Sequence, residues 1–322
     1  MQPIQKRGVM VGLGQVFEQV VENIPERADR VYAGPVLDWI EANRERNFFG
    51  YLHVADPHAP YQPPRSHRGW YEEMLAAEGR PRWADAMWLQ RARRALYDGE
   101  VAFNDDALRP LIDHLEDLAL LDQTVIVFIS DHGEHLGEHD LWDHIPPSFL
   151  QVIRVPLLIR LPGGSTGARS VEQPVQLVDL MPTLLDLADI DSSRLPLHGR
   201  SLLPLLEPDG DREPLDLAVV QEAMSYRRAD DPKDVGSLVW DRWHFLDSGK
   251  APALLFDHRS DPAEEVPLRS EEALRERARS ALSELRRLDD ELRGLLGDEN
   301  PEAVVIDLDN IVNLEALGYL DP

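Results

Sequence analysis

Residues 124–133 read TVIVFISDHG, a run of β-branched and apolar residues that ends in Ser-Asp-His-Gly. Such a composition is typical of a central strand in a parallel sheet, buried on both faces. Doubly wound α/β sheets build their ligand sites at the carboxyl ends of the strands. Asp131 and His132 follow this strand directly, so the segment predicts both the fold class and the place of a functional site.

Helical and strand patterns alternate around this strand. Apolar spacing predicts helices at residues 28–47, 84–121 and 179–188, and strands at residues 48–55 and 155–160, the first of these buried. Pro110 is expected to kink the second helix or to divide it in two, because a proline inside a helix costs about 3 kcal/mol. The alternation favours an α/β fold built on a doubly wound sheet.

The pattern changes after about residue 210. Short apolar segments separated by turn residues predict a small antiparallel sheet, and a charged helix is expected at residues 271–295. We therefore predict an α/β domain over residues 1–210, followed by an α+β subdomain with an acidic tail over residues 211–322.

The charge of the chain excludes one class of partner. Its 322 residues include 33 Lys and Arg against 59 Asp and Glu, a net charge of −26, which repels nucleic acid.

No apolar run reaches the roughly 18 residues that a membrane span needs. The residues before Glu18 do not read as a signal peptide. The chain as written is therefore expected in the cytoplasm, and export is expected only if a preceding segment carries a signal.

The loop after the central strand reads SDHGEHLGEH over residues 130–139. Gly133 lets the backbone turn tightly, so that an Asp131 oxygen and a His132 nitrogen can face one cation. A bare Asp-His-Gly is more often a solvated loop in which the Asp caps a helix. The further histidines and glutamates in this loop favour a metal site.

A second loop reads HVADPHAPY over residues 53–61 and begins at the end of the strand expected at residues 48–55. Pro57 and Pro60 bracket His58 and stiffen its loop, as a residue that must meet a ligand without a large entropic loss requires. A proline-rich turn whose histidine caps a backbone carbonyl fits the same residues equally well.

These segments together resemble the sulfatase family of the alkaline-phosphatase-like superfamily. The same resemblance is carried by YDGEVA at 97–102, LWDH at 141–144, RVPLLIR at 154–160, LFDHRSDPAEE at 255–265 and LEALGYL at 314–320. It spans nearly the whole chain. It implies an alkaline-phosphatase-like doubly wound sheet, incomplete at the N-terminus, with a small C-terminal antiparallel sheet and a helix.

The resemblance also implies roles for four residues. Asp131 and His132 match the family's later pair of metal ligands, and the implied ion is a divalent cation, Ca²⁺. His58 matches the histidine that contacts the sulfate group. His144 falls near the position where relatives place Lys or His to bind a sulfate oxygen and to assist the leaving group. The implied substrate is a sulfate ester of a small molecule or a glycan.

The family's nucleophile motif, Cys/Ser-x-Pro-x-Arg, is absent from this chain, which has no cysteine. The strand with the family's paired metal-binding aspartates is absent as well. We therefore expect the isolated chain to be inactive and to need an N-terminal sulfatase segment as a separate chain. Two alternatives stay open, a non-catalytic sulfatase-like binding or partner subunit, and a phosphate or phosphonate ester hydrolase of the same superfamily.

Overall fold

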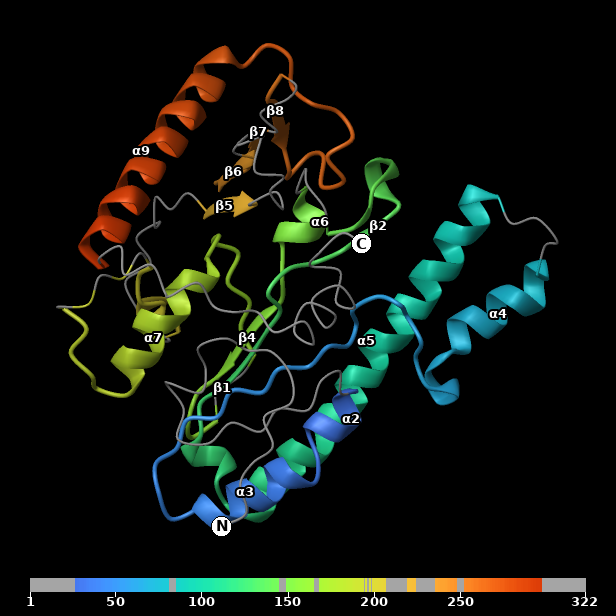
Figure 1. Cartoon of the computed structure of the whole chain (residues 1–322), viewed down its shortest axis with the longest axis vertical. Coiled ribbons are helices and arrows are strands. Elements are labelled where there is room, and N and C mark those ends of the chain that lie inside the picture. Colours follow the sequence, from blue (N-terminus) through green and yellow to red (C-terminus); the bar gives the residue numbers. More distant parts are fainter. Residues whose placement is uncertain are drawn as a thin grey trace, which may run out of the picture. The chain divides into compact units, whose positions relative to one another are not determined.

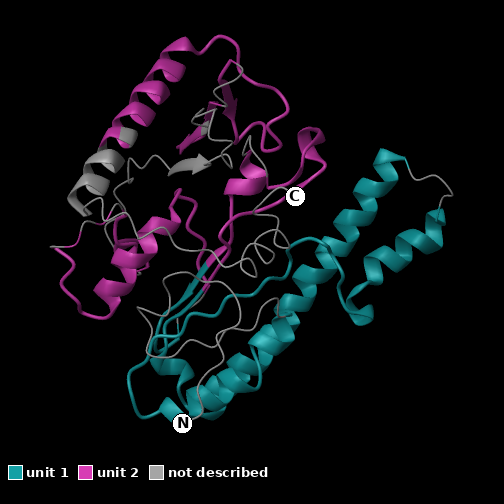
Figure 2. Cartoon of the chain, viewed as in Figure 1, with its two compact units in different colours: residues 1–127, 158–166, 303–322 teal, residues 128–157, 167–302 magenta. Residues whose placement is uncertain are grey.

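The computed structural model describes residues 27–80, 85–144, 149–164, 168–193, 195, 197, 199–206, 219–223, 235–247 and 252–296. The chain forms two compact units (Figure 2). Unit 1 comprises residues 1–127, 158–166 and 303–322, and unit 2 comprises residues 128–157 and 167–302. The domain boundary predicted near residue 210 lies outside the described residues and stays a prediction.

Two short strands contain two of the points where the chain passes from one unit to the other. They are β1 (Ile126–Ile129) and β4 (Leu157–Arg160), and they form a two-stranded sheet. Both lie inside the segments in which the apolar pattern predicted strands, so these two predictions are confirmed.

Unit 1 is mostly helical (Figure 1). Its helices are α2 (Ala28–Val31), α3 (Pro35–Asn43), η1 (Arg65–His67), α4 (Gly69–Glu78), α5 (Ala86–Asp117) and η2 (Leu121–Gln123). The helix predicted at residues 28–47 is two helices, because Gly34, with a φ of 57°, interrupts it before α3. The helix predicted at residues 84–121 is α5, which runs through Pro110 without interruption, so the division into two helices does not occur.

One face of α5 forms the core of unit 1. Phe103, Ala107, Leu111 and Leu115 recur every four residues and are buried. This spacing places their side chains on one side of the helix, where they pack with the buried residues of the α2 and α3 region. At the N-terminus of α5, the Asp85 side chain accepts a hydrogen bond from the Trp88 backbone N–H at 2.7 Å.

The prediction of a buried strand at residues 48–55 is wrong. Phe49, Tyr51 and Leu52 are 62%, 51% and 36% exposed, and no sheet of the described residues includes this segment. A strand persists only where a neighbouring strand accepts and donates its backbone hydrogen bonds. The apolar composition of the segment favoured burial, but composition does not supply the neighbouring strand.

Unit 2 contains the predicted antiparallel sheet and helix. Its strands lie in the order β5 (Val219–Ala223), β6 (Val235–Trp240), β7 (Trp243–Asp247) and β8 (Leu254–Asp257). The helix α9 (Glu272–Leu296) lies beside this sheet (Figure 1). The remaining elements of unit 2 are β2 (His135–Leu136), η3 (Glu138–Asp140), β3 (Trp142–Asp143), α6 (Leu150–Ile153), η4 (Leu177–Asp179), α7 (Leu180–Leu187) and α8 (Leu203–Leu206).

Both faces of the antiparallel sheet are covered. Successive residues of a strand point to opposite faces. Phe245 of β7 packs with Ala278 and Leu282 of α9, whereas the next residue, Leu246, packs with Phe149 on the other face. Full burial of such a side chain contributes roughly 1.5–3 kcal/mol, so the sheet is stabilised from both sides.

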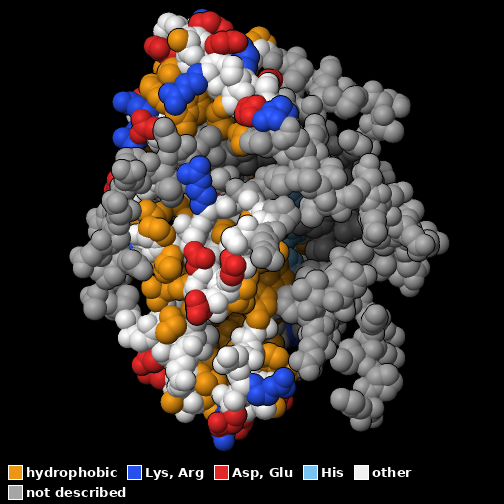
Figure 3. All heavy atoms as spheres, turned by 90° about the vertical axis from the view of Figure 1, so that its left-hand side faces the viewer, with side chains coloured by type: hydrophobic (Ala, Val, Ile, Leu, Met, Phe, Trp, Pro, Cys, Tyr) orange, Lys and Arg blue, Asp and Glu red, His pale blue; other side chains and the backbone are white. Residues whose placement is uncertain are grey.

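The outer side of α9 is charged. Arg279 pairs with Glu272 and Glu276, and Arg287 pairs with Glu284. Figure 3 shows basic and acidic side chains next to one another at this end of unit 2. Exposed pairs of this kind contribute about 0–1 kcal/mol each, so α9 is held by its apolar face. None of the helices in the described ranges combines the length and the apolar composition that crossing a bilayer requires.

Candidate functional site

A short hairpin shapes the loop that follows β1. Strands β2 and β3 pair antiparallel, with His135 opposite Asp143 and Leu136 opposite Trp142. Extending this register by one residue places Glu134 opposite His144. The Glu134 Oε1 atom lies 3.1 Å from the His144 Nδ1 atom. The hairpin therefore brings His144 into contact with Glu134, near the beginning of the loop.

His132 lies against the same histidine. The ring centroids of His132 and His144 are 4.2 Å apart. The His132 Nδ1 atom lies 2.8 Å from the Gly133 carbonyl oxygen, which can only accept a hydrogen bond. Nδ1 therefore carries the proton, and Nε2 keeps the lone pair that a metal would use.

Asp131 precedes this ring with its carboxylate turned to solvent. One carboxylate oxygen accepts a hydrogen bond from the His132 backbone N–H at 2.9 Å, and the side chain is 60% exposed. The carboxylate lies 3.9 Å from the His132 Nε2 atom. An Asp oxygen and an imidazole nitrogen in this arrangement are chemically able to act as two ligands of one divalent ion.

Glu134 also determines the charge preference of His144. The hydrogen bond to Glu134 raises the pKa of the His144 imidazole, and the negative charges of Glu134, Asp143 and Asp131 act in the same direction. Burial opposes this effect, because it disfavours the charged ring. The pairing with Glu134 therefore favours the protonated imidazole.

The backbone after His132 is held by α6. The Gly133 N–H donates to the Val152 carbonyl at 2.6 Å, and the Glu134 N–H donates to the Gln151 carbonyl at 3.1 Å. A Cβ atom on Gly133 would lie 2.1 Å from the Gln151 carbonyl oxygen. This close approach leaves room for glycine alone at position 133.

His58 lies in unit 1, in the second predicted loop. Its Nδ1 atom is 2.7 Å from the Ala59 carbonyl oxygen, and its Nε2 atom is buried. Its backbone N–H donates to the Ala55 carbonyl at 2.8 Å. The Asp56–Pro57 and Ala59–Pro60 peptide bonds are cis. The hydrogen bond to Ala59 fixes the proton on Nδ1 and leaves the lone pair on Nε2.

Helix α5 supports the loop that contains His58. The Glu100 carboxyl accepts a hydrogen bond from the Gln62 backbone N–H, and the Asn104 amide donates to the Asp56 carbonyl at 3.0 Å. A Cβ atom on Gly99 would lie 2.2 Å from the His67 carbonyl oxygen. One stretch of α5 therefore contacts the segment on both sides of His58.

The Glu100 carboxyl is the buried acidic group of this contact. Only 4% of the residue is exposed, and burial raises the pKa of its carboxyl to about 7. The hydrogen bond from Gln62 lowers this pKa, the charge of Asp56 raises it, and the charge of Arg27 lowers it. The second carboxyl oxygen of Glu100 is buried and has no hydrogen-bond partner among the described residues.

Three of the four predicted site residues lie together. Asp131, His132 and His144 lie in unit 2 within one loop and hairpin, whereas His58 lies in unit 1. Across the described residues, no group of three or more His, Asp and Glu side chains is arranged to hold a metal ion. The roles given to the four residues in the sequence analysis stay predictions.

Sequence reasoning missed the roles of Glu134 and Glu100. The pairing of Glu134 with His144 depends on the register of a hairpin that the sequence did not reveal. Glu100 precedes the buried Phe103 by three residues, so the helical spacing already placed it on the buried face of α5. A carboxyl on a buried face is a signal that could have identified it.

Two family models match the chain. The Sulfatase model matches residues 10–190, and a model described as N-sulphoglucosamine sulphohydrolase, C-terminal, matches residues 137–291. Choline-sulfatase of Rhizobium meliloti is 34% identical over 178 residues, which cover 55% of this chain and 33% of the relative. The multifunctional alkaline phosphatase superfamily protein PehA of Trinickia caryophylli is 31% identical over 208 residues, which cover 60% of this chain and 40% of the relative. The chain thus spans less than half the length of these curated relatives.

Solved structures show the same fold. The sulfatase YidJ of Bacteroides fragilis aligns with a TM-score of 0.67 at 20% identity, over 82% of this chain and 60% of the other. The phosphonate monoester hydrolase of Agrobacterium radiobacter aligns with a TM-score of 0.59 at 23% identity, over 80% of this chain and 59% of the other. The family match over more than half of the sequence, together with these likenesses in fold, establishes that the chain belongs to the sulfatase family and has an alkaline-phosphatase-like fold.

Proposed function

We propose that this chain contributes the later half of a metal-dependent active site that hydrolyses sulfate esters. The observation that carries the proposal is the hairpin that joins Asp131, His132 and the Glu134–His144 pair into one cluster. This cluster falls inside the residues that the Sulfatase family model matches.

Two residues of the cluster fit as metal ligands. Members of the family generally use a divalent metal, and we assign Asp131 and the Nε2 atom of His132 as ligands, with Ca²⁺ as the ion. The exposed carboxylate and the tautomer fixed by Gly133 support this assignment. A hard cation takes six or more ligands, so further ligands must come from outside this cluster. When bound, the cation would neutralise charge on the sulfuryl oxygens.

Two histidines would contact the sulfate group. We assign His144 to a sulfate oxygen and to the departing alcohol, because Glu134 holds its Nδ1 atom and so orients the ring. We assign His58 to the sulfate group as well, since the hydrogen bond to Ala59 and the contacts with α5 fix its loop. The substrate class is a sulfate ester of a small molecule or a glycan.

The nucleophile must come from another segment. The chain has no cysteine and no Ser-x-Pro-x-Arg sequence, and it spans less than half the length of the curated relatives it matches. We therefore propose that the chain is inactive alone and acts with an N-terminal sulfatase segment as a separate chain. The exposed apolar side chains of Phe49, Tyr51 and Leu52 support a partner that covers them.

The test is co-expression with the segment encoded directly upstream of Met1. We expect hydrolysis of 4-nitrophenyl sulfate only when both chains are present, its loss with a chelator, and its recovery with Ca²⁺. Asp131→Asn should lower the rate by more than about 100-fold, since even groups that only orient a metal ligand contribute 10–100-fold. The matched control is Asp140→Asn, an exposed carboxylate of the same loop, which should leave the rate within about twofold.

The same assay separates the alternatives. The relative PehA, a multifunctional member of the superfamily, favours a phosphate or phosphonate ester hydrolase as the second candidate. Faster hydrolysis of 4-nitrophenyl phosphate or of a phenylphosphonate ester than of the sulfate would favour that candidate. An upstream sequence without a nucleophile motif, together with no hydrolysis of any ester, would favour a non-catalytic binding subunit.

A further inference from the structure

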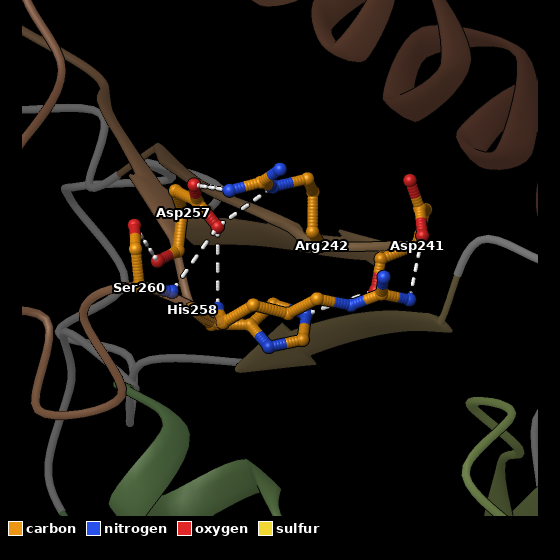
Figure 4. A network of polar contacts seen from close by, with 6 residues as sticks. Asp241, Arg242, Asp257, His258 and Ser260 are labelled. Atoms are coloured by element: carbon orange, nitrogen blue, oxygen red, sulfur yellow. Dashed lines mark hydrogen bonds and ion pairs between the residues drawn. The ribbon is translucent and has the colours of Figure 1, made fainter.

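The segment LFDHRSDPAEE at residues 255–265 begins in β8 and continues into a turn that directs one carboxyl inward. Asp257 pairs with Arg242 (Figure 4). It also accepts a hydrogen bond from the Arg259 N–H at 3.2 Å. Asp261 accepts from the Val266 N–H at 2.8 Å. Glu264 follows in the left-handed region with a φ of 58° and is 1% exposed. The two aspartates hold the backbone of the turn, and Glu264 is its buried acid.

The two oxygens of Glu264 contact two different parts of unit 2. Oε1 lies 2.5 Å from the Nδ1 atom of His244 in β7, and Oε2 accepts a hydrogen bond from the Leu150 backbone N–H at 2.8 Å. The Nε2 atom of His244 lies 2.6 Å from the Ser237 hydroxyl in β6. A Ser-His-Glu set can serve a hydrolase. Here the three residues are 0–2% exposed, which excludes a substrate and leaves a structural network.

Helix α6 connects this network to the candidate site. Leu150 is its first residue, and the carbonyls of the next two residues, Gln151 and Val152, hold the backbone of Glu134 and Gly133. The Gln151 side chain also donates to the Ala263 carbonyl at 3.4 Å. One short helix therefore contacts the turn that contains Ala263 and Glu264 and also the backbone of Gly133 and Glu134.

We propose that Glu264 is a positioning residue for the candidate site, because its carboxylate anchors α6 and α6 in turn fixes the backbone at Gly133 and Glu134. Among the acids of this segment, Glu264 is the one with a described hydrogen bond to α6, because its Oε2 atom accepts from the Leu150 N–H. The proposal rests on the proposed function only in taking residues 131–144 as part of the active site. The contact between Glu264 and α6 does not depend on catalysis.

The Glu264 carboxylate is the acceptor for two buried groups. Removing the carboxylate leaves the Leu150 N–H and the His244 ring without their acceptor in a buried place. Leaving a buried donor unpaired is costly, whereas replacing the carboxylate by an amide of the same shape keeps an acceptor for Leu150. Glu264→Gln should therefore preserve the position of α6, and Glu264→Ala should not.

The experiment is amide hydrogen exchange on the full chain. In Glu264→Ala, peptides that cover residues 131–144 should exchange at least tenfold faster, while peptides from residues 180–187 of α7, in the same unit, stay unchanged. Glu264→Gln should stay within about threefold of the parent protein, since it keeps the acceptor. Asp257→Asn is the matched control, because it alters the same turn but contacts Arg242 rather than α6.

Two results would overturn the proposal. One is exchange of residues 131–144 that is no faster in Glu264→Ala than in Asp257→Asn. The other is equal acceleration in the Gln and Ala variants. If Glu264→Ala unfolds unit 2 as a whole, which faster exchange in α7 would reveal, Glu264→Asp replaces it, because its shorter side chain cannot reach both partners. No outcome depends on ester hydrolysis, so failure of the proposed function would be seen separately in the activity assay.

Discussion

The two loops that carry the predicted site residues are held in different ways. Side chains of α5 hold the loop around His58, through the Glu100 carboxyl and the Asn104 amide. Backbone carbonyls of α6 hold the loop after His132, through the N–H groups of Gly133 and Glu134. A side chain that holds a loop can be removed by substitution, and a carboxyl such as Glu100 can also change its protonation. A backbone carbonyl cannot be substituted, so its contact is disturbed only when a neighbouring residue changes size.

The backbone-held loop is expected to show the largest effect. Gly133→Ala would bring a Cβ atom to 2.1 Å from the Gln151 carbonyl oxygen, so α6 or the loop must move. We expect a loss of more than about 3 kcal/mol in the free energy of unfolding, measured by urea titration. Gly50→Ala is the control, because nothing lies within 4 Å of its Cβ position. Similar stabilities for the two variants would mean that α6 does not confine the loop.

The side-chain-held loop is expected to depend on pH. Burial raises the pKa of Glu100 from 4.5 to about 7, so the folded chain binds more protons than the unfolded chain between these values. Stability therefore falls as the pH rises through this window. Glu100→Gln cannot ionise and keeps an acceptor for Gln62, so it should be more stable than the parent at pH 8 by up to about 3 kcal/mol. The difference should disappear near pH 4.5.

Urea unfolding of the Glu100→Gln variant and the parent at pH 5 and pH 8 measures this difference. Glu73→Gln, an exposed carboxyl on α4, provides the reference for removal of a negative charge. If the two variants differ from the parent by the same amount at both pH values, burial of Glu100 does not control the stability of this loop.

The smallest effect is expected at Asn104. Asn104→Ala removes the hydrogen bond to the Asp56 carbonyl and should cost about 1 kcal/mol. Asn43→Ala removes a similar bond to the Trp39 carbonyl in α3 and should cost about the same. Only the first should speed exchange of the His58 N–H, which is bonded to the Ala55 carbonyl. Equal exchange at His58 in both variants would contradict the role of α5 in holding this loop.

The pattern of apolar residues predicted the elements whose formation depends mainly on their own sequence. The strands β1 and β4, the helix α5 and the C-terminal antiparallel sheet with α9 lie in the regions where the sequence placed them. The segment at residues 48–55 failed because a strand also requires a partner, which its own composition cannot reveal. The interruption at Gly34 required its backbone conformation to be known.

The candidate site was predictable to the extent that its residues are close in sequence. Asp131 and His132 follow β1, and the motif around them indicated a site. The pairing of Glu134 with His144 spans ten residues and depends on a hairpin register. The bond between Glu264 and Leu150 joins residues 114 apart in sequence, and no local pattern indicates such a contact.

The unbroken length of α5 allows a distance along this helix to be measured in solution. Met87 and Glu116 are exposed near its two ends and lie about 44 Å apart at 1.5 Å per residue. The chain has no cysteine, so two introduced thiols at these positions would be the only sites for fluorescent dyes. Energy transfer between the dyes would then report in solution whether the helix stays straight through Pro110 or bends there.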